Sequence, residues 1–168
     1  VEVRFLIIFR QISKLIKREE SDWQRSELEE LPNLFKTASE LAKRDRENQM
    51  DGTNHSYSDY FEMREKQFRL LQEILDLIDE LPEKEKLNNK LAVFIDKLGK
   101  AVHTNDTARA FLEELHVLKE KFKQVELPTT YQDFETKSVL FQLLQVIERY
   151  LSLKVNLMEP EDKRITPQ

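Results

Sequence analysis

Residues 57–81 read YSDYFEMREKQFRLLQEILDLIDEL, and apolar side chains recur at helical spacing along the whole stretch. Positions three and four apart share one face of a helix, and here two such rows run side by side. The first row holds Phe61, Arg64, Phe68, Leu71, Leu75 and Ile78, and the second holds Tyr60, Met63, Gln67, Leu70, Ile74, Leu77 and Leu81. Together the rows form a broad apolar face, which predicts a long helix with neighbours on two sides.

Similar spacing on either side of this helix predicts an all-α chain. We expect a first helix over about 3–20, a second that ends near residue 50, and a third over about 57–81. A fourth should run from Pro82 to near Gly99, a fifth from Asn105 or Asp106 to about 125, and a sixth over about 133–156. The second helix can start at a capping box at Ser26 or at Pro32. Short connections favour antiparallel neighbours, which predicts an up-and-down bundle of five to six helices with a four-helix-bundle-like core. We expect one domain over 1–168, with a loose polar tail from residue 159.

Two polar residues, Arg64 and Gln67, interrupt the apolar rows of the 57–81 helix. A buried guanidinium needs a partner, because its desolvation otherwise costs several kcal/mol. Folding this helix back onto the second one places residue 64 opposite residue 44 or 45. We therefore predict an Arg64–Asp45 ion pair, with Asn48, Tyr60 and Gln67 as hydrogen-bond partners. The cluster is interpreted either as a structural lock on helix register or as a pocket whose arginine binds a ligand carboxylate.

Composition limits the chemistry that the chain can perform. The 168 residues include no cysteine, which excludes disulfides, zinc–thiolate sites and a cysteine nucleophile. The two glycines cannot form a phosphate-binding loop, and no Gly-x-Ser-x-Gly elbow is present. Residues 113–116 give one Glu-x-x-His spacing, whereas a di-iron bundle needs two. We therefore predict a protein that is not an enzyme and that holds no metal or cofactor.

Charge is distributed unevenly along the chain. Residues 1–18 carry five cations and one anion, which gives a net charge of +4. Because the whole chain has a net charge of −5, the remaining residues have a net charge of −9. The acidic remainder argues against binding to nucleic acid. The basic segment is typical of a juxtamembrane helix on the cytoplasmic side, or of an amphipathic helix with a solvated basic face. Leu6 and Ile7 lie off its apolar stripe and are expected to face water in an isolated domain. Their exposure would be explained by a neighbour that is missing, either a membrane or a partner subunit.

Several blocks resemble one known domain. They are residues 42–48 (AKRDREN), 60–67 (YFEMREKQ), 103–108 (HTNDTA), 127–135 (LPTTYQDFE) and the pair Leu140-Phe141. In this order they are similar to the C-terminal cytoplasmic domain of putative aromatic acid exporters, a family of bacterial membrane proteins. The resemblance extends over about residues 5–155.

The resemblance implies a helical-bundle domain that follows an N-terminal transmembrane region absent from this chain. It implies a regulatory or assembly role on the cytoplasmic side of the cell membrane, in a transport protein that can form homo-oligomers. Arg64 would then be a candidate contact for an aromatic carboxylate. The alternative is a free-standing soluble adaptor built as a helical bundle, with no upstream apolar segments.

Overall fold

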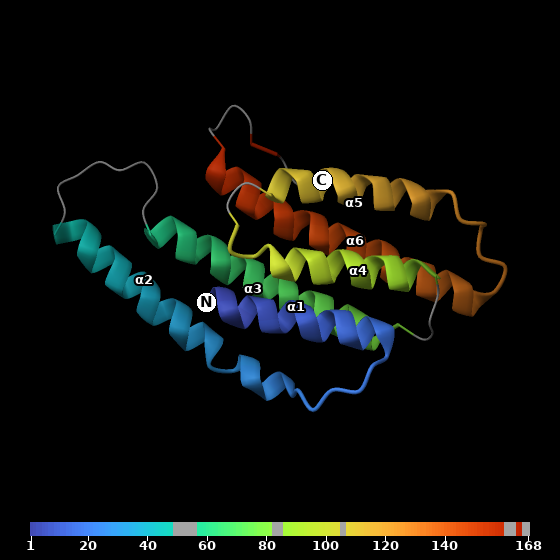
Figure 1. The fold of residues 1–168 in the computed structure, drawn as a ribbon, viewed down its shortest axis with the longest axis horizontal. Coiled ribbons are helices and arrows are strands. Elements are labelled where there is room, and N and C mark those ends of the chain that lie inside the picture. The colour runs from blue at the N-terminus through green and yellow to red at the C-terminus, as the bar shows by residue number, and fades with distance from the viewer. Residues whose placement is uncertain (49–56, 82–85, 105–106, 160–163, 166–168) are drawn as a thin grey trace.

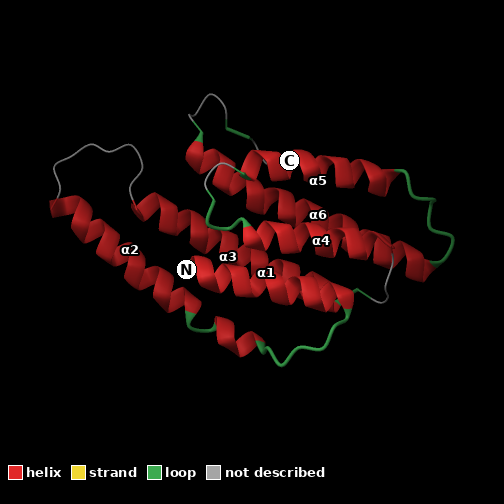
Figure 2. Ribbon diagram, in the orientation of Figure 1, coloured by secondary structure: helices red, strands yellow, loops and turns green. Residues whose placement is uncertain are grey.

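The computed structural model describes residues 1–48, 57–81, 86–104, 107–159 and 164–165, without the side chains of 46–48 and 86–88. These residues form α-helices and one short 3-10 helix, and no strand occurs among them (Figure 2). The elements are α1 (Glu2–Lys17), η1 (Arg25–Leu28), α2 (Leu31–Asn48), α3 (Tyr57–Asp79), α4 (Lys86–Lys100), α5 (Ala108–Lys123) and α6 (Tyr131–Met158). The predicted all-α fold is confirmed.

Successive helices run in opposite directions, as the colour change along the ribbon shows (Figure 1). The helix α1 packs against α4 and α3, while α3 also packs against α6 and α2. The helix α5 covers α6 and touches α4 only lightly. The central bundle is therefore made of α1, α3, α4 and α6, with α2 and α5 on its outside. This is the predicted up-and-down arrangement.

The first helix lies inside the bundle rather than along its edge. Its apolar stripe is almost fully buried, and the ring of Phe9 meets Tyr150 of α6 edge to face at 5.2 Å between centroids. Each such side chain contributes about 2 kcal/mol by leaving water. Leu6 and Ile7 are half-buried, so the expectation that they face water is wrong. The reason is that α1 has neighbours on several sides, where the prediction assumed one.

A glycine permits a close contact between α1 and α4. A methyl group placed on Gly99 of α4 would lie 2.7 Å from the Cβ of Phe9, too close for two carbon atoms. Further along the same interface, the hydroxyl of Ser13 donates to the carbonyl oxygen of Ala92 at 3.1 Å. The absence of a side chain at position 99 therefore sets how deeply α1 sits against α4.

Helix ends decide where the chain turns. The 3-10 helix η1 starts in a capping box formed by Gln24 and Glu27, and α2 begins at Leu31 with Pro32 in its first turn. Of the two predicted starts for the second helix, Pro32 is therefore correct. The helix α1 ends at Lys17, and Arg18 caps it with a left-handed backbone (φ 57°) and an N–H that bonds the carbonyl oxygen of Leu15.

The C-terminal tail returns to the bundle at one point. The side-chain amide of Asn156 donates to the carbonyl oxygen of Ile165 at 2.8 Å and accepts from its N–H at 2.7 Å. Ile165 packs against the core, so the tail is anchored at that residue; residues 160–163 and 166–168 lie outside the described residues. Within the described ranges, no helix combines the length and apolarity needed to cross a membrane.

Candidate functional site

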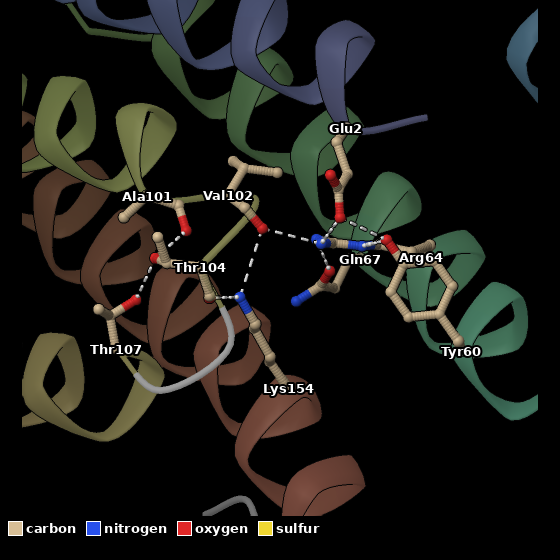
Figure 3. Close-up of polar contacts among 9 residues, drawn as sticks. All are labelled: Glu2, Tyr60, Arg64, Gln67, Ala101, Val102, Thr104, Thr107 and Lys154. Carbon is tan, nitrogen blue, oxygen red and sulfur yellow. Dashed lines mark hydrogen bonds and ion pairs between the residues drawn. The ribbon is translucent and has the colours of Figure 1, made fainter. Parts of the chain in front are cut away.

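The side chain of Arg64 is buried between helices at 1% exposure, at the end of the bundle where α1 begins and α4 ends. Its Nε donates to the hydroxyl of Tyr60 at 3.1 Å, and its two terminal nitrogens donate to Gln67 Oε1 and to the Val102 carbonyl oxygen, each at 3.0 Å (Figure 3). The guanidinium also lies 5.2 Å from the ring centroids of Phe5 and Tyr60, a cation–π distance. Arg64 is therefore satisfied by groups from α1, α3 and the turn after α4.

The carboxylate beside Arg64 comes from α1. Glu2, in the first helical turn, lies 3.7 Å from the guanidinium and accepts a hydrogen bond of 3.0 Å from Tyr60. Tyr60 thus accepts from Arg64 and donates to Glu2, which links the three side chains in one network. The Glu2 side chain is 45% exposed, so the ion pair sits at the edge of the core.

The predicted Arg64–Asp45 ion pair is wrong. Asp45 is exposed on α2, and among the described carboxylates only Glu2 comes within ion-pair distance of Arg64. The prediction assumed that α2 covers the face of α3 that carries residue 64, whereas α1 occupies that position. Asn48 was expected in the same cluster, but its side chain lies outside the described residues. The predicted hydrogen bonds to Tyr60 and Gln67 are confirmed.

Gln67 connects Arg64 to α6. Its side chain is fully buried, and its amide nitrogen donates to the carbonyl oxygen of Tyr150 at 3.0 Å while its oxygen accepts from Arg64. Both polar ends of the amide are therefore occupied. Because a one-residue slide of α3 against α6 would break the bond to Tyr150, Gln67 fixes the register of these two helices.

A second buried cation, Lys154 of α6, shares a partner with Arg64. Its ammonium donates to the carbonyl oxygens of Val102 at 3.3 Å and Thr104 at 2.6 Å (Figure 3). Burial, and next the charge of Arg64, lower the pKa of Lys154 to about 8, although Glu2 opposes the shift. Two cations thus neutralise the carbonyl end of α4, where the helix dipole is negative.

Lys154 and Glu2 were not predicted as members of this group, although the sequence carries signals for both. Lys154 lies three residues after Leu151, on the inward row of the last predicted helix, so a polar residue at that position needed a partner. Glu2 is the single acidic residue among the first eighteen. Its contact with Arg64 depends on α1 entering the centre of the bundle, which spacing along the chain does not reveal.

The cluster formed by Glu2, Tyr60, Arg64, Gln67 and Lys154 is packed tightly. The cavity beside Arg64 and Lys154 has a volume of about 10 Å³, room for about one water molecule. Burial also raises the pKa of the Tyr150 hydroxyl that borders it, against the lowering effect of Arg64. In this conformation, no space remains there for an aromatic carboxylate, so the arrangement ties α1, α3, α6 and the turn after α4 together rather than enclosing a ligand.

The described residues contain no group of three or more histidine, aspartate or glutamate side chains that could hold a metal ion. The one Glu-x-x-His spacing places His116 on an exposed face of α5. There its Nε2 lies 3.4 Å from Glu148 of α6, and Lys119 pairs with the same carboxylate. This group links α5 to α6 at the surface.

Comparison with known proteins gives three results. A family model described as "Putative aromatic acid exporter C-terminal domain" matches residues 1–155. The chain is 33% identical over 154 residues to "Uncharacterized protein YqjA" of Bacillus subtilis (strain 168), across 92% of this chain and 48% of that protein. It thus spans about half the length of this curated relative. A crystal structure of a putative membrane protein from Clostridium difficile 630 matches with a TM-score of 0.79 at 18% identity, covering 94% of this chain and 92% of that one, which indicates a shared fold.

Proposed function

Since the chain belongs to the family of putative aromatic acid exporter C-terminal domains, we propose that it serves as the cytoplasmic regulatory or assembly domain of an exporter-like membrane transport protein. The length of the Bacillus relative, about twice the matched region, supports a further segment in such proteins. The family description supports placing that segment before α1. In this proposal the domain has no catalytic step, and transport belongs to the rest of the protein.

The observation that carries the proposal is the position of the first turn of α1. Glu2 contacts Arg64 and Tyr60 of α3, while Phe5 packs under the guanidinium. Arg64 in turn holds the carbonyl oxygen of Val102, to which Lys154 of α6 also donates. A displacement of α1 at its N-terminus would therefore disturb contacts to α3, to the turn after α4 and to α6 together. This gives the bundle a means to respond to movement of the segment that precedes it.

The charge of α1 supports placement at a cytoplasmic membrane surface. Arg4 and Arg10 are exposed on the helix, while the apolar stripe faces the core. Basic residues close to a membrane-spanning segment favour the cytoplasmic side, and they are attracted to anionic lipid headgroups. The remainder of the domain is acidic and would be repelled by the same surface, which favours an orientation with the start of α1 towards the membrane.

Cell fractionation tests this proposal. The native gene product, tagged at its own C-terminus, is followed in the source organism by immunoblot after a high-salt wash of the membranes. We expect a band clearly heavier than the 20.1 kDa of this chain, retained in the membrane fraction. A protease should remove the tag in inverted vesicles and not in intact cells. A soluble band near 20 kDa would contradict the proposal and support the free-standing adaptor instead.

A further inference from the structure

A groove runs along the surface between α4 and α5, away from the Arg64 cluster. Its volume is about 410 Å³, within the range of small-molecule sites in proteins. The groove exists because α4 and α5 make few backbone contacts with each other, although both belong to the same hydrophobic core. It is lined by Asn89, Lys90, Val93, Phe94, Glu114, Val117, Leu118 and Lys121.

The floor and walls of the groove are apolar. Phe94 and Leu118 are buried beneath it, whereas Val93 and Val117 are 50% and 56% exposed on either side. Because the two helices are antiparallel, these valines come from positions that face each other across the groove. An apolar body lying between them would remove both side chains from water, which is favourable.

The charged residues that line the groove determine which kind of molecule can bind in it. Glu114 is the acidic residue among those lining the groove, and Lys97 neutralises it through an ion pair of 3.0 Å. The other two charged lining residues are Lys90 and Lys121. On antiparallel helices, residues 97 and 114 lie on one side of the valines and residues 90 and 121 lie on the other. An otherwise acidic protein therefore presents two ammonium groups at the same end of an apolar groove.

We propose that the α4–α5 groove binds a small amphiphilic carboxylate, with its apolar body over Val93 and Val117 and its anionic group between Lys90 and Lys121. Two ammonium groups can each donate to one carboxylate oxygen. The body can be an aromatic ring or a short alkyl chain, since the groove supplies apolar contact without a shaped slot. The inference rests on the groove alone and stands whether or not the domain belongs to a transporter.

Binding of 2-naphthoate, octanoate and the uncharged 2-naphthalenemethanol to the whole 168-residue chain tests the site. Chemical shifts in ¹H–¹⁵N spectra locate the contact, and titration gives the affinity. We expect saturable shifts at residues 89–94 and 114–121 with at least one of the two carboxylates, and weaker binding of the alcohol. The preferred carboxylate shows whether the natural ligand carries an aromatic or an alkyl body.

The matched variants remove the same charge from two places. Lys90→Gln with Lys121→Gln should weaken carboxylate binding about tenfold, while Lys36→Gln with Lys43→Gln on the exposed face of α2 should leave it unchanged. Val93→Asp should abolish binding, with the circular dichroism spectrum reporting that the bundle is intact. Equal binding by both double variants, shifts elsewhere on the surface, or no saturable binding would overturn the proposal. So would a dimer that Val93→Asp separates, because a second copy would then occupy the groove.

Discussion

The Arg64 cluster and the α4–α5 groove are two polar regions of one small bundle with opposite properties. In the cluster, two cations are buried, and the hydrogen bonds of Arg64 reach two side chains of its own helix and the turn after α4. In the groove, two lysines lie at the surface beside apolar side chains that are half exposed. The comparison teaches that the buried arginine, which looks like a ligand contact in the sequence, has its ligands inside the protein. The surface groove has the space that the cluster lacks.

The largest effect on stability should come from removing Arg64. Arg64→Ala leaves the oxygen of Gln67 buried without a donor and opens a cavity in the core, which together cost about 3–4 kcal/mol. Such a loss should lower the melting temperature by about 10 °C in a domain of this size. Arg69→Ala on the same helix removes an exposed arginine whose one ion-pair partner among the described residues is Glu65, and it should cost about 0.5 kcal/mol or less. Equal melting temperatures for the two variants would show that the contacts of Arg64 do not contribute to the stability of the fold.

The contact at Gly99 should produce the next largest effect. Gly99→Ala introduces a methyl group 2.7 Å from Phe9 Cβ, an atom fixed to the backbone of α1 that cannot rotate away. We expect a loss of about 2 kcal/mol in urea unfolding, despite the higher helix propensity of alanine. Asn89→Ala, an exposed position on α4, is the control and should gain or lose less than about 0.5 kcal/mol. A more stable Gly99→Ala variant would mean that α1 can move without cost.

Lys154 should make stability depend on pH. Its pKa is about 8 in the folded protein, below its ordinary value of 10.5, so the folded state releases the proton first as pH rises. The unfolded state then binds more protons, and the free energy of unfolding should increase between pH 8 and 10 through this group. Because the site is partly hydrated, the loss of this charge should add about 1–2 kcal/mol to the free energy of unfolding.

Comparison with Lys154→Met isolates that dependence. Burial raises the pKa values of Tyr60 and Tyr150, which lowers stability above pH 10, so measurements are made from pH 7 to 9.5. The stability of the wild type relative to Lys154→Met should rise with pH across this range. If the difference in unfolding free energy between the two proteins stays constant or falls with pH, the ammonium group of Lys154 is exposed to water and not buried.

A smaller effect should distinguish Glu2 from Asp45. Glu2→Gln weakens the pair with Arg64 but keeps an acceptor for Tyr60, so we expect a loss of about 1 kcal/mol. Asp45→Asn makes the same chemical change on the exposed face of α2 and should alter stability by less than about 0.3 kcal/mol. Chemical denaturation of both variants at pH 7 measures the difference. A larger loss in Asp45→Asn would restore the pairing expected from sequence.

The groove should contribute least to stability. Lys90→Gln with Lys121→Gln removes two exposed charges with no ion pair among the described residues, so the unfolding free energy should change by less than about 0.5 kcal/mol. A binding defect in this double variant would therefore come from the site and not from unfolding. A loss above 2 kcal/mol would indicate that the lysines support the bundle.

The helices themselves follow from local sequence. The two apolar rows of α3 and Pro32 in the first turn of α2 locate elements correctly, because spacing and capping are properties of neighbouring residues. The same rows identify Arg64 as a buried cation in need of partners, and two of its partners lie on the same helix. What fails is the choice of carboxylate. Glu2 and Asp45 are both far from Arg64 along the chain, and only the packing of α1 into the bundle decides between them.

A double-mutant cycle tests this account most directly. Glu2→Gln and Arg64→Ala are made singly and together, and a second cycle pairs Arg64→Ala with Asp45→Asn, with unfolding free energies measured in urea. We expect a coupling energy of about 1 kcal/mol between Glu2 and Arg64, and none beyond about 0.3 kcal/mol between Asp45 and Arg64. That result would show that Arg64 holds the first turn of α1. Additive effects in the first cycle, or coupling in the second, would contradict the link between the start of α1 and the rest of the bundle.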